Sequence, residues 1–321
     1  MNAMNNISNK EAMGETLVKM GKIDRDIIVL TSDARNSSSI TNFVKELPEQ
    51  FVEVGIAEQN LVSIAAGLAA SGKKPFITSP ACFLSSRTIE QIKIDVAYSK
   101  TNVKIIGISG GISYGTLGMS HNSLQDISIM RAIPGIAVIL PADRYETQNM
   151  VEAFVNYKGP VYARIGRNPV PDIYESKKYG FKIGKAVTLK NGSDITIITT
   201  GETAKIAIDS ASVLQEVGII CRVLNMHTIK PLDKNAIIKA AEETGHIITV
   251  EESSIHGGLG AAVAEVVAQN HPVYMEIIGI PDEPAITGTP VQIYDYYGLS
   301  ISNITKMAKK LLKNRKVYLY E

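Results

Sequence analysis

A carboxylate at the start of an apolar helix is the strongest candidate for chemistry in this sequence. Glu58 lies in the first turn of a helix that we predict from about Ala57 to Gly72, after an apolar strand, Phe51 to Val54, and a turn at Gly55. The helix dipole favours an acid in the first turn. A carboxylate in apolar surroundings is nevertheless costly unless a partner pairs with it. The stretch alone therefore leaves two interpretations open, a helix cap or a carboxylate that awaits the proton donor of a ligand.

The other candidates follow predicted strands, and ligands of open α/β sheets bind beyond the carboxyl ends of strands. Each one alone has an ordinary explanation. Asp33 can start a turn, Phe83 can be a core residue, and His121 or Arg167 can be a solvated surface residue. Because they share one edge of one predicted sheet, together they indicate a site. The segments are Asp33, Glu58, Phe83 with Arg87, the loop Ser109 to His121, and Arg164 with Arg167.

Apolar strands alternate with helices along the whole chain, which predicts two α/β domains with mostly parallel sheets. The rhythm breaks between Pro171 and Ser193, a stretch rich in Tyr, Lys and Gly. We therefore expect a first domain over residues 1–178 and a second over residues 179–321. In the first domain, the segment Phe83 to Tyr98 is expected to be one helix. Predicted strands of the second domain are Asp194 to Thr199, Cys221 to Asn225, Ile247 to Glu251 and Val273 to Ile277.

The composition argues against several classes of protein. The chain has 321 residues with a net charge of +1, so no strong field suggests a nucleic acid or a membrane surface as partner. Two distant cysteines, Cys82 and Cys221, form neither a disulfide framework nor a metal cluster. The first residues lack an apolar signal core, and no run reaches transmembrane length. We expect a cytoplasmic protein.

Several ordered motifs resemble one enzyme family. VGIAEQN, the helix with Phe83 and Arg87, GMSHNSLQDISIMRAIPGIAVILPAD and GPVYARIGR look like the C-terminal part of the transketolase and deoxyxylulose phosphate synthase family. VEESSIHGGLGAAVAEVV is similar to the last domain of that family and to the β subunit of 2-oxoacid dehydrogenases. The resemblance covers almost the whole chain. It implies a pyrimidine-binding domain followed by the transketolase C-terminal domain, with thiamine diphosphate as cofactor.

The resemblance gives roles to individual residues. It implies that Glu58 binds N1′ of the cofactor's aminopyrimidine and so promotes loss of the thiazolium C2 proton. Phe83 is expected to stack on the pyrimidine, Asp33 and Ala34 to lie near the thiazolium, and Arg87 to line the pocket.

The family's diphosphate and Mg²⁺ motif, a GDG followed by an Asn, has no match in this sequence. The chain resembles the second subunit of a split enzyme, and we expect no metal ligands in it. The implied partner is an N-terminal transketolase subunit that holds most of the Mg²⁺ and diphosphate site. The expected assembly is α2β2 around a homodimer core.

The substrate loop departs from the family pattern. Leu117 stands where an Asp would contact substrate hydroxyls, and Ser109 stands about where a His would lie. His121 is retained, and Arg167 matches the Arg that receives the terminal phosphate of the sugar. Loss of two polar groups argues for a modified or branched ketose rather than the ordinary pentose phosphates.

These features predict the C-terminal subunit of a transketolase that moves a two-carbon ketol unit from an anionic ketose to an aldose. His121 joins Glu58 as an expected catalytic residue. Three alternatives stay open: a decarboxylating synthase of the deoxyxylulose phosphate type, the β subunit of a 2-oxoacid dehydrogenase, and a non-catalytic regulatory subunit.

Overall fold

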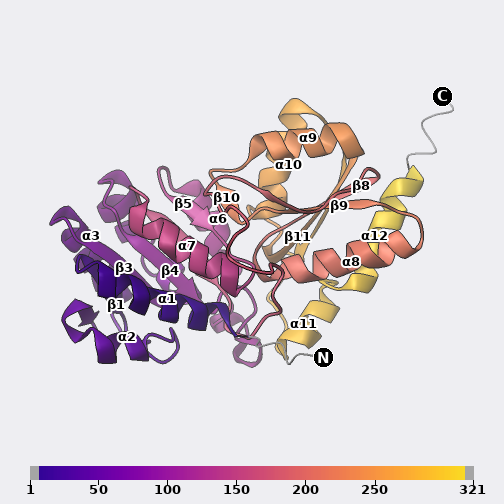
Figure 1. Cartoon of the computed structure of the whole chain (residues 1–321). Coiled ribbons are helices and arrows are strands. Elements are labelled where there is room, and N and C mark those ends of the chain that lie inside the picture. Colours follow the sequence, from indigo (N-terminus) through magenta and orange to yellow (C-terminus); the bar gives the residue numbers. More distant parts are fainter. Residues whose placement is uncertain (1–6, 315–321) are drawn as a thin grey trace.

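The computed structural model describes residues 7–314 and shows two α/β units beside each other (Figure 1). Each unit is built on one mostly parallel sheet, as predicted, and each contains helices that pack on its sheet. The first unit lies at the left in indigo to magenta, and the second lies at the right in orange to yellow.

The first sheet has seven strands in the order β10-β5-β6-β4-β3-β1-β2. All pair in parallel except β10, which is antiparallel to β5 and comes from the second half of the chain. The first-half strands are β1 (Ile27–Thr31), β2 (Phe51–Glu53), β3 (Lys74–Pro80), β4 (Lys104–Ile108), β5 (Ala137–Ile139) and β6 (Val161–Ile165), and the added strand is β10 (Thr228–Lys230).

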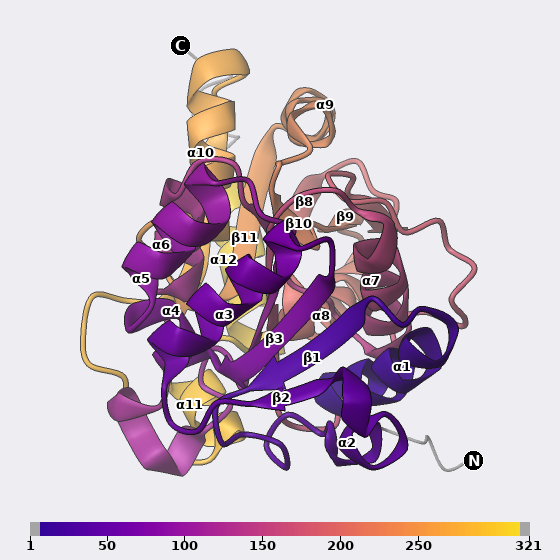
Figure 2. The same ribbon diagram turned by 90° about the vertical axis from the view of Figure 1, so that its left-hand side faces the viewer.

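Both faces of this sheet are covered, which explains its nearly continuous apolar strands. One face carries a buried row made by Leu30, Ile77, Ile105, Tyr162 and Val138, which are register neighbours across five strands. Figure 2 shows helices α3 to α6 on this side and α1 with α7 on the other. The helices are α1 (Asn9–Ile23), α2 (Thr41–Glu46), η1 (Pro48–Gln50), α3 (Glu58–Ala70), α4 (Ala81–Ser86), α5 (Ile89–Gln91), η2 (Ile92–Tyr98), η3 (Gly115–Ser120), α6 (Asp126–Ala132) and α7 (Arg144–Asn156).

The single helix expected from Phe83 to Tyr98 is wrong. The segment divides into α4, α5 and η2, and η2 is a π-helix. The break falls at Thr88, whose backbone leaves the helical region and whose hydroxyl donates to the carbonyl of Leu84. A Thr that bonds back to the preceding turn competes with the regular helix, which accounts for the interruption.

The second sheet has five strands in the order β12-β11-β8-β9-β7, with β7 antiparallel to β9 at one edge. The four parallel strands match the predicted ones within a few residues. Strands β7 and β10 each add antiparallel to the edge of a sheet and were not predicted, because neither contains a buried apolar run. The strands are β7 (Val187–Lys190), β8 (Ile195–Thr199), β9 (Cys221–Asn225), β11 (His246–Ser254) and β12 (Tyr274–Ile280), and the helices are η4 (Gly201–Thr203), α8 (Ala204–Glu216), α9 (Lys234–Thr244), α10 (Leu259–Asn270), α11 (Pro290–Tyr296) and α12 (Ile301–Asn314).

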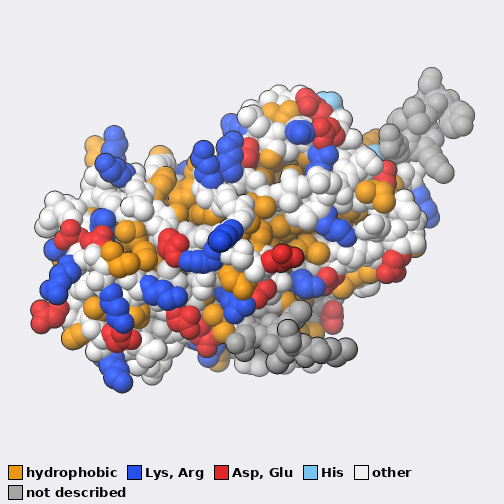
Figure 3. Space-filling view, in the orientation of Figure 1, with side chains coloured by type: hydrophobic (Ala, Val, Ile, Leu, Met, Phe, Trp, Pro, Cys, Tyr) orange, Lys and Arg blue, Asp and Glu red, His pale blue; other side chains and the backbone are white. Residues whose placement is uncertain are grey.

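The surface in Figure 3 carries both signs of charge interspersed, in agreement with the net charge of +1. Among residues 7–314, no helix has the length and apolar character needed to cross a membrane.

Candidate active site

The predicted site residues gather at the carboxyl edge of the first sheet. Asp33 follows β1, Ser109 follows β4 and Arg167 follows β6, while α3 and α4 begin after β2 and β3. Parallel strands end at the same edge, so these segments meet although they are far apart in the sequence.

Glu58 is the first residue of α3, and only 5% of its surface is exposed. No side chain caps this helix. Arg87 Nη1 donates to both carboxylate oxygens of Glu58, at 3.0 and 3.1 Å. A buried carboxylate is stabilised by such a donor, and the interpretation of Glu58 as a side-chain cap gains no support.

Phe83 and Arg87 lie one turn apart, on α4 and at its C-terminal cap. The guanidinium carbon of Arg87 lies 4.2 Å from the centroid of the Phe83 ring. The planar guanidinium therefore stacks on an aromatic face while its N–H groups bind a buried carboxylate. Any planar ring that bears N–H donors could make the same two contacts.

His121 continues the cluster from the loop after β4. Its ring meets Phe83 and Tyr114 edge to face, with centroids 5.3 Å apart in both pairs. Its Nδ1 lies 3.0 Å from the hydroxyl of Ser120. Tyr114 in turn carries the guanidinium of Arg167, 5.1 Å from the ring centroid.

Glu58, Arg87, Phe83, His121, Tyr114 and Arg167 thus form one continuous series of contacts, which we call the edge series. One end is a buried carboxylate beside an aromatic face, and the other end is an exposed cation. The series can hold a flat N–H-bearing heterocycle at one end and an anion at the other. Tyr114 was missed by the sequence analysis, because an aromatic residue in a glycine-rich loop gives no signal of its own.

Lys10 is a second cation near Arg167 that the sequence analysis missed. Burial lowers the pKa of its ammonium group, and the charge of Arg167 lowers it further. Lys10 lies in the first turn of α1, where the helix dipole disfavours a cation. A bound anion would offset both the repulsion from Arg167 and the unfavourable helix dipole. A Lys in the first turn of a predicted helix was the available sequence signal.

Asp33 follows β1 and Ser109 follows β4, on either side of β3, and both have strained backbones with φ angles of 54° and 55°. Non-glycine residues with positive φ are costly and concentrate at functional sites. The Ser109 hydroxyl is buried without a hydrogen-bond partner. Ala34 is buried, and Leu117 is 52% exposed in η3. These four residues share the edge but make no described side-chain contact with the edge series.

Glu53, at the end of β2, ties two of these loops together and was also missed. Its carboxylate accepts the backbone N–H groups of Asp33 at 2.8 Å and Gly55 at 3.1 Å, and it pairs with Arg35. Burial raises the pKa of the Glu53 carboxyl, but these donors outweigh burial and bring the pKa below its usual value. Glu53 therefore positions both Asp33 and the turn that leads to Glu58.

Arg164 does not belong to the loop in which it was predicted. It lies in β6, is buried, and pairs with Asp126 of α6 at 3.2 Å. It is a structural cation between the two units rather than a group that faces the edge series.

Comparison with known proteins gives consistent matches over most of the chain. Residues 5–172 match the family model described as transketolase, pyrimidine binding domain, and residues 184–304 match transketolase, C-terminal domain. The chain is 50% identical to one subunit of the apulose-4-phosphate transketolase of Phocaeicola vulgatus, over 97% of this chain and 99% of that protein. It is 36% identical to 6-deoxy-6-sulfo-D-fructose transketolase subunit SqwH of Clostridium sp. (strain MSTE9), over 94% and 93%.

Among solved structures, one titled "Split gene transketolase, inactive beta4 tetramer" superposes with a TM-score of 0.89 at 36% identity, over 96% of this chain and 99% of that one. Transketolase from Campylobacter jejuni superposes with a TM-score of 0.80 at 20% identity, and the match covers 47% of that longer chain. The second likeness shows the shared fold.

Proposed function

Because the chain belongs to the transketolase family, we propose that it is the pyrimidine-binding subunit of a split, thiamine diphosphate-dependent transketolase. In this function it transfers a two-carbon ketol unit from an anionic ketose to an aldose. The observation that carries the proposal is the pairing of buried Glu58 with a planar cation stacked on Phe83.

The residues present fit the aminopyrimidine half of the cofactor. Arg87 offers Glu58 N–H donors from a flat group that lies on an aromatic face, which is the chemistry an aminopyrimidine offers. Glu58 would hold a proton at N1′, and Phe83 would support the ring. When bound, thiamine diphosphate supplies a carbon nucleophile and an electron sink for breaking the bond beside the ketose carbonyl.

The substrate would lie along the rest of the edge series. His121, held between Phe83 and Tyr114, can exchange protons with ketose oxygens. Arg167 and Lys10 would bind the terminal anion. Exposed Leu117 offers no hydrogen bond to a sugar hydroxyl. This supports a ketose that lacks or displaces one hydroxyl, and the 50% identical relative leads us to propose a branched ketose phosphate such as apulose 4-phosphate.

The partner would be an N-terminal subunit that carries the diphosphate and Mg²⁺ site, in an α2β2 assembly. Relatives named as subunits, matched over almost their whole length, support this part of the proposal. Ile56, a large apolar side chain beside Glu58 and Arg87, is 76% exposed. Ile56 precedes Glu58, so a surface that covers it would also close the site.

The first test uses the chain reconstituted with its N-terminal partner. We expect Glu58→Gln to fold and assemble but to lower kcat by about 10²- to 10⁴-fold, because the variant cannot hold the proton at the cofactor. Exchange of the cofactor's C2 proton, followed by NMR, should slow in parallel. Glu90→Gln, which changes an exposed acid on α5, is the matched control and should behave as wild type.

The same preparation tests the partner and the substrate. The isolated chain should bind thiamine diphosphate weakly by titration calorimetry, and the pair should bind it with Mg²⁺.

Ketol transfer by the pair should be fastest with a branched ketose phosphate, slower with xylulose 5-phosphate and absent with pyruvate alone. Fast C2 exchange in Glu58→Gln, or a decarboxylating reaction with pyruvate, would refute the proposal.

A further inference from the structure

The loop between β4 and α6 carries both Leu117 and His121, yet it contains little regular structure of its own. Its only helical segment, within the described residues, is the 3-10 stretch η3, which is kinked at Gly118. Two backbone hydrogen bonds between Gly111 and Ser123 close the loop at its base. The position of that base, and with it the position of His121, then depends on the residues that hold the base from outside.

The start of the loop is packed against Arg164 of the first unit and Glu252 of the second. A Cβ on Gly111 would lie 2.3 Å from the carboxyl carbon of Glu252, and one on Gly110 would lie 2.2 Å from Cγ of Arg164. Gly111 also has a φ of +60°, which glycine tolerates. Two successive glycines therefore bring the backbone directly onto these two side chains.

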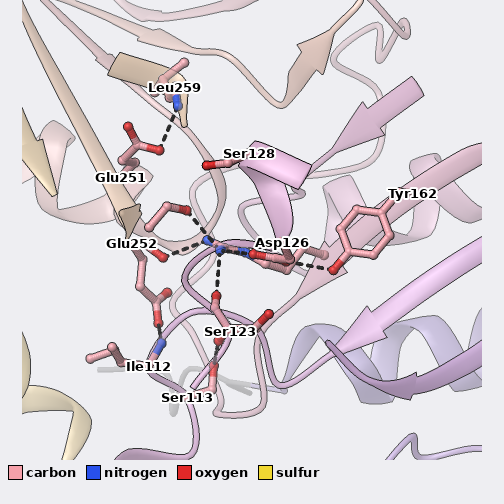
Figure 4. Close-up of polar contacts among 12 residues, drawn as sticks. Ile112, Ser113, Ser123, Asp126, Ser128, Tyr162, Glu251, Glu252 and Leu259 are labelled. Atoms are coloured by element: carbon pink, nitrogen blue, oxygen red, sulfur yellow. Dashed lines mark hydrogen bonds and ion pairs between the residues drawn. The ribbon is translucent and has the colours of Figure 1, made fainter. Parts of the chain in front are cut away.

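Glu252, on β11 of the second unit, binds that backbone directly. Its Oε1 accepts the N–H of Ile112 at 2.6 Å, as Figure 4 shows. Tyr294 of α11 hydrogen-bonds to the same carboxylate. Glu252 is therefore fixed on its own side and bonded to the loop on the other, and its side chain is buried.

The far end of the loop is tied to the same strand. The N–H of Ser254 donates to the carbonyl of Leu124 at 3.1 Å. Arg164 bridges the two sides, since Nη2 donates to the Glu252 carbonyl at 2.9 Å and Nη1 to Ser253 Oγ at 3.0 Å and Asp126 Oδ1 at 3.2 Å. Both ends of the segment that carries His121 are thus anchored on β11.

We propose that Glu252 is a positioning residue for ketol transfer, which acts from the C-terminal domain by clamping the loop that presents His121. The inference rests on the proposed function, because it gives His121 a role in the reaction. Glu252 binds the loop through the backbone N–H of Ile112, whereas the ring of His121 is in contact with Phe83 and Tyr114. Loss of the clamp should therefore misplace the imidazole rather than remove a reacting group.

The test compares Glu252→Ala and Glu252→Gln with Glu251→Ala and Glu251→Gln in the reconstituted pair. Glu251 is the adjacent acid on β11 and is also buried, but it binds the N–H groups of Leu259 and Gly260 at 2.7 Å instead of the loop. Amide hydrogen exchange of residues 109–124 reports the clamp, and the kcat and KM of ketol transfer report its consequence.

We expect Glu252→Ala to speed exchange in residues 109–124 and lower kcat by about tenfold or more, with KM changed by less than about threefold. Glu252→Gln keeps an acceptor oxygen and should lie between wild type and alanine. Both Glu251 variants should leave loop exchange and kcat near wild type, whatever they do to thermal stability.

Unchanged loop exchange in both Glu252 variants would overturn the proposal, and so would equal effects in the Glu251 variants. Faster loop exchange with unchanged kcat would also overturn it. If the wild-type pair transfers no ketol unit, the proposed function fails, while the exchange data still decide whether Glu252 clamps the loop. If Glu252→Ala does not fold, Glu252→Gln decides by the same criteria.

Discussion

At the scale of single residues, the candidate site joins charged groups that are each unfavourable without a partner of opposite charge or a hydrogen-bond donor. Buried Glu58 needs an N–H donor, and Arg87 supplies one from a guanidinium that is itself stacked on Phe83. Lys10 and Arg167 share positive charge that an anion would neutralise. His121 sits between these two ends, and its position is set by two aromatic rings.

Steady-state kinetics should distinguish the residues that bind the anion, Arg167 and Lys10, from the residue that exchanges protons, His121. Arg167→Ala and Lys10→Met should raise KM for a ketose phosphate by about tenfold or more with a smaller change in kcat, since each removes a charged hydrogen bond to the anion. His121→Ala should mainly lower kcat, because proton exchange is lost. Steady-state kinetics of the reconstituted pair measures both, and Arg25→Ala, at the opposite edge of the sheet, is the control. If KM were unchanged in both cation variants, Arg167 and Lys10 would not bind the anion of the substrate.

That Glu58, Phe83, Arg87, His121 and Arg167 lie close together could be predicted from the sequence, because their segments follow predicted strands of one sheet. The structure brings these five together. Tyr114, Glu53 and Glu252 could not be found in this way, and the only sequence signal for Lys10 was a cation in the first turn of a helix. Tyr114 depends on the path of one loop, and Glu252 lies 140 residues from its partner Ile112. Such contacts arise from tertiary packing, which periodicity and spacing do not describe.

At the scale of elements, regular strands were predictable and interruptions were not. The parallel strands agree within a few residues because buried apolar runs mark them. The break at Thr88 depends on one hydroxyl that donates back to Leu84, and the edge strands β7 and β10 lack the buried apolar run that marks the other strands. The loop from Ser109 to Leu124 is the element whose shape depends most on packing from outside.

Gly111→Ala tests the packing of that element. The added methyl meets the Glu252 carboxyl, whereas Gly218→Ala adds one at a positive φ of 81° with nothing within 4 Å. Each variant should lose about 1 kcal/mol in free energy of unfolding from the backbone strain alone. Gly111→Ala should lose more and also lower kcat, and Gly218→Ala should keep kcat unchanged. Denaturant unfolding and steady-state kinetics provide the comparison. Equal losses in the two variants would mean that the loop moves away from Glu252 without cost.

At the scale of the whole molecule, buried and partly buried acids lie between the two units. Glu202, at the start of the second unit's first helix, accepts the side-chain N–H of Asn9 at 2.9 Å and packs against Gly166. Burial raises the pKa of the Glu202 carboxyl to about 8, and the neighbouring charge of Glu252 adds to the shift. The folded protein therefore keeps a proton on Glu202 that the unfolded chain loses above its ordinary pKa of 4.5.

The sign of the pH dependence follows from that proton. Between pH 4.5 and about 8 the folded state binds more protons than the unfolded state, so the free energy of unfolding falls as the pH rises and levels off above that range. Each unit of pKa difference corresponds to about 1.4 kcal/mol. Glu202→Gln should flatten this slope, and Glu216→Gln, an exposed acid on α8, should not. The measurement is denaturant unfolding from pH 5 to 9. If Glu202 were ionised in the folded state, Glu202→Gln would show the same dependence of unfolding free energy on pH as the wild type.

The added strand β10 also imposes an order of events during synthesis. Thr228 and Lys230 pair with Ile139 and Val138, so β5 is an edge strand until residue 230 has left the ribosome. An exposed edge of a parallel sheet is a surface on which nascent chains can pair with one another. By the time β10 covers that edge, the chain has also emerged through β9, and the pyrimidine-binding half becomes protected only as its neighbour begins to fold.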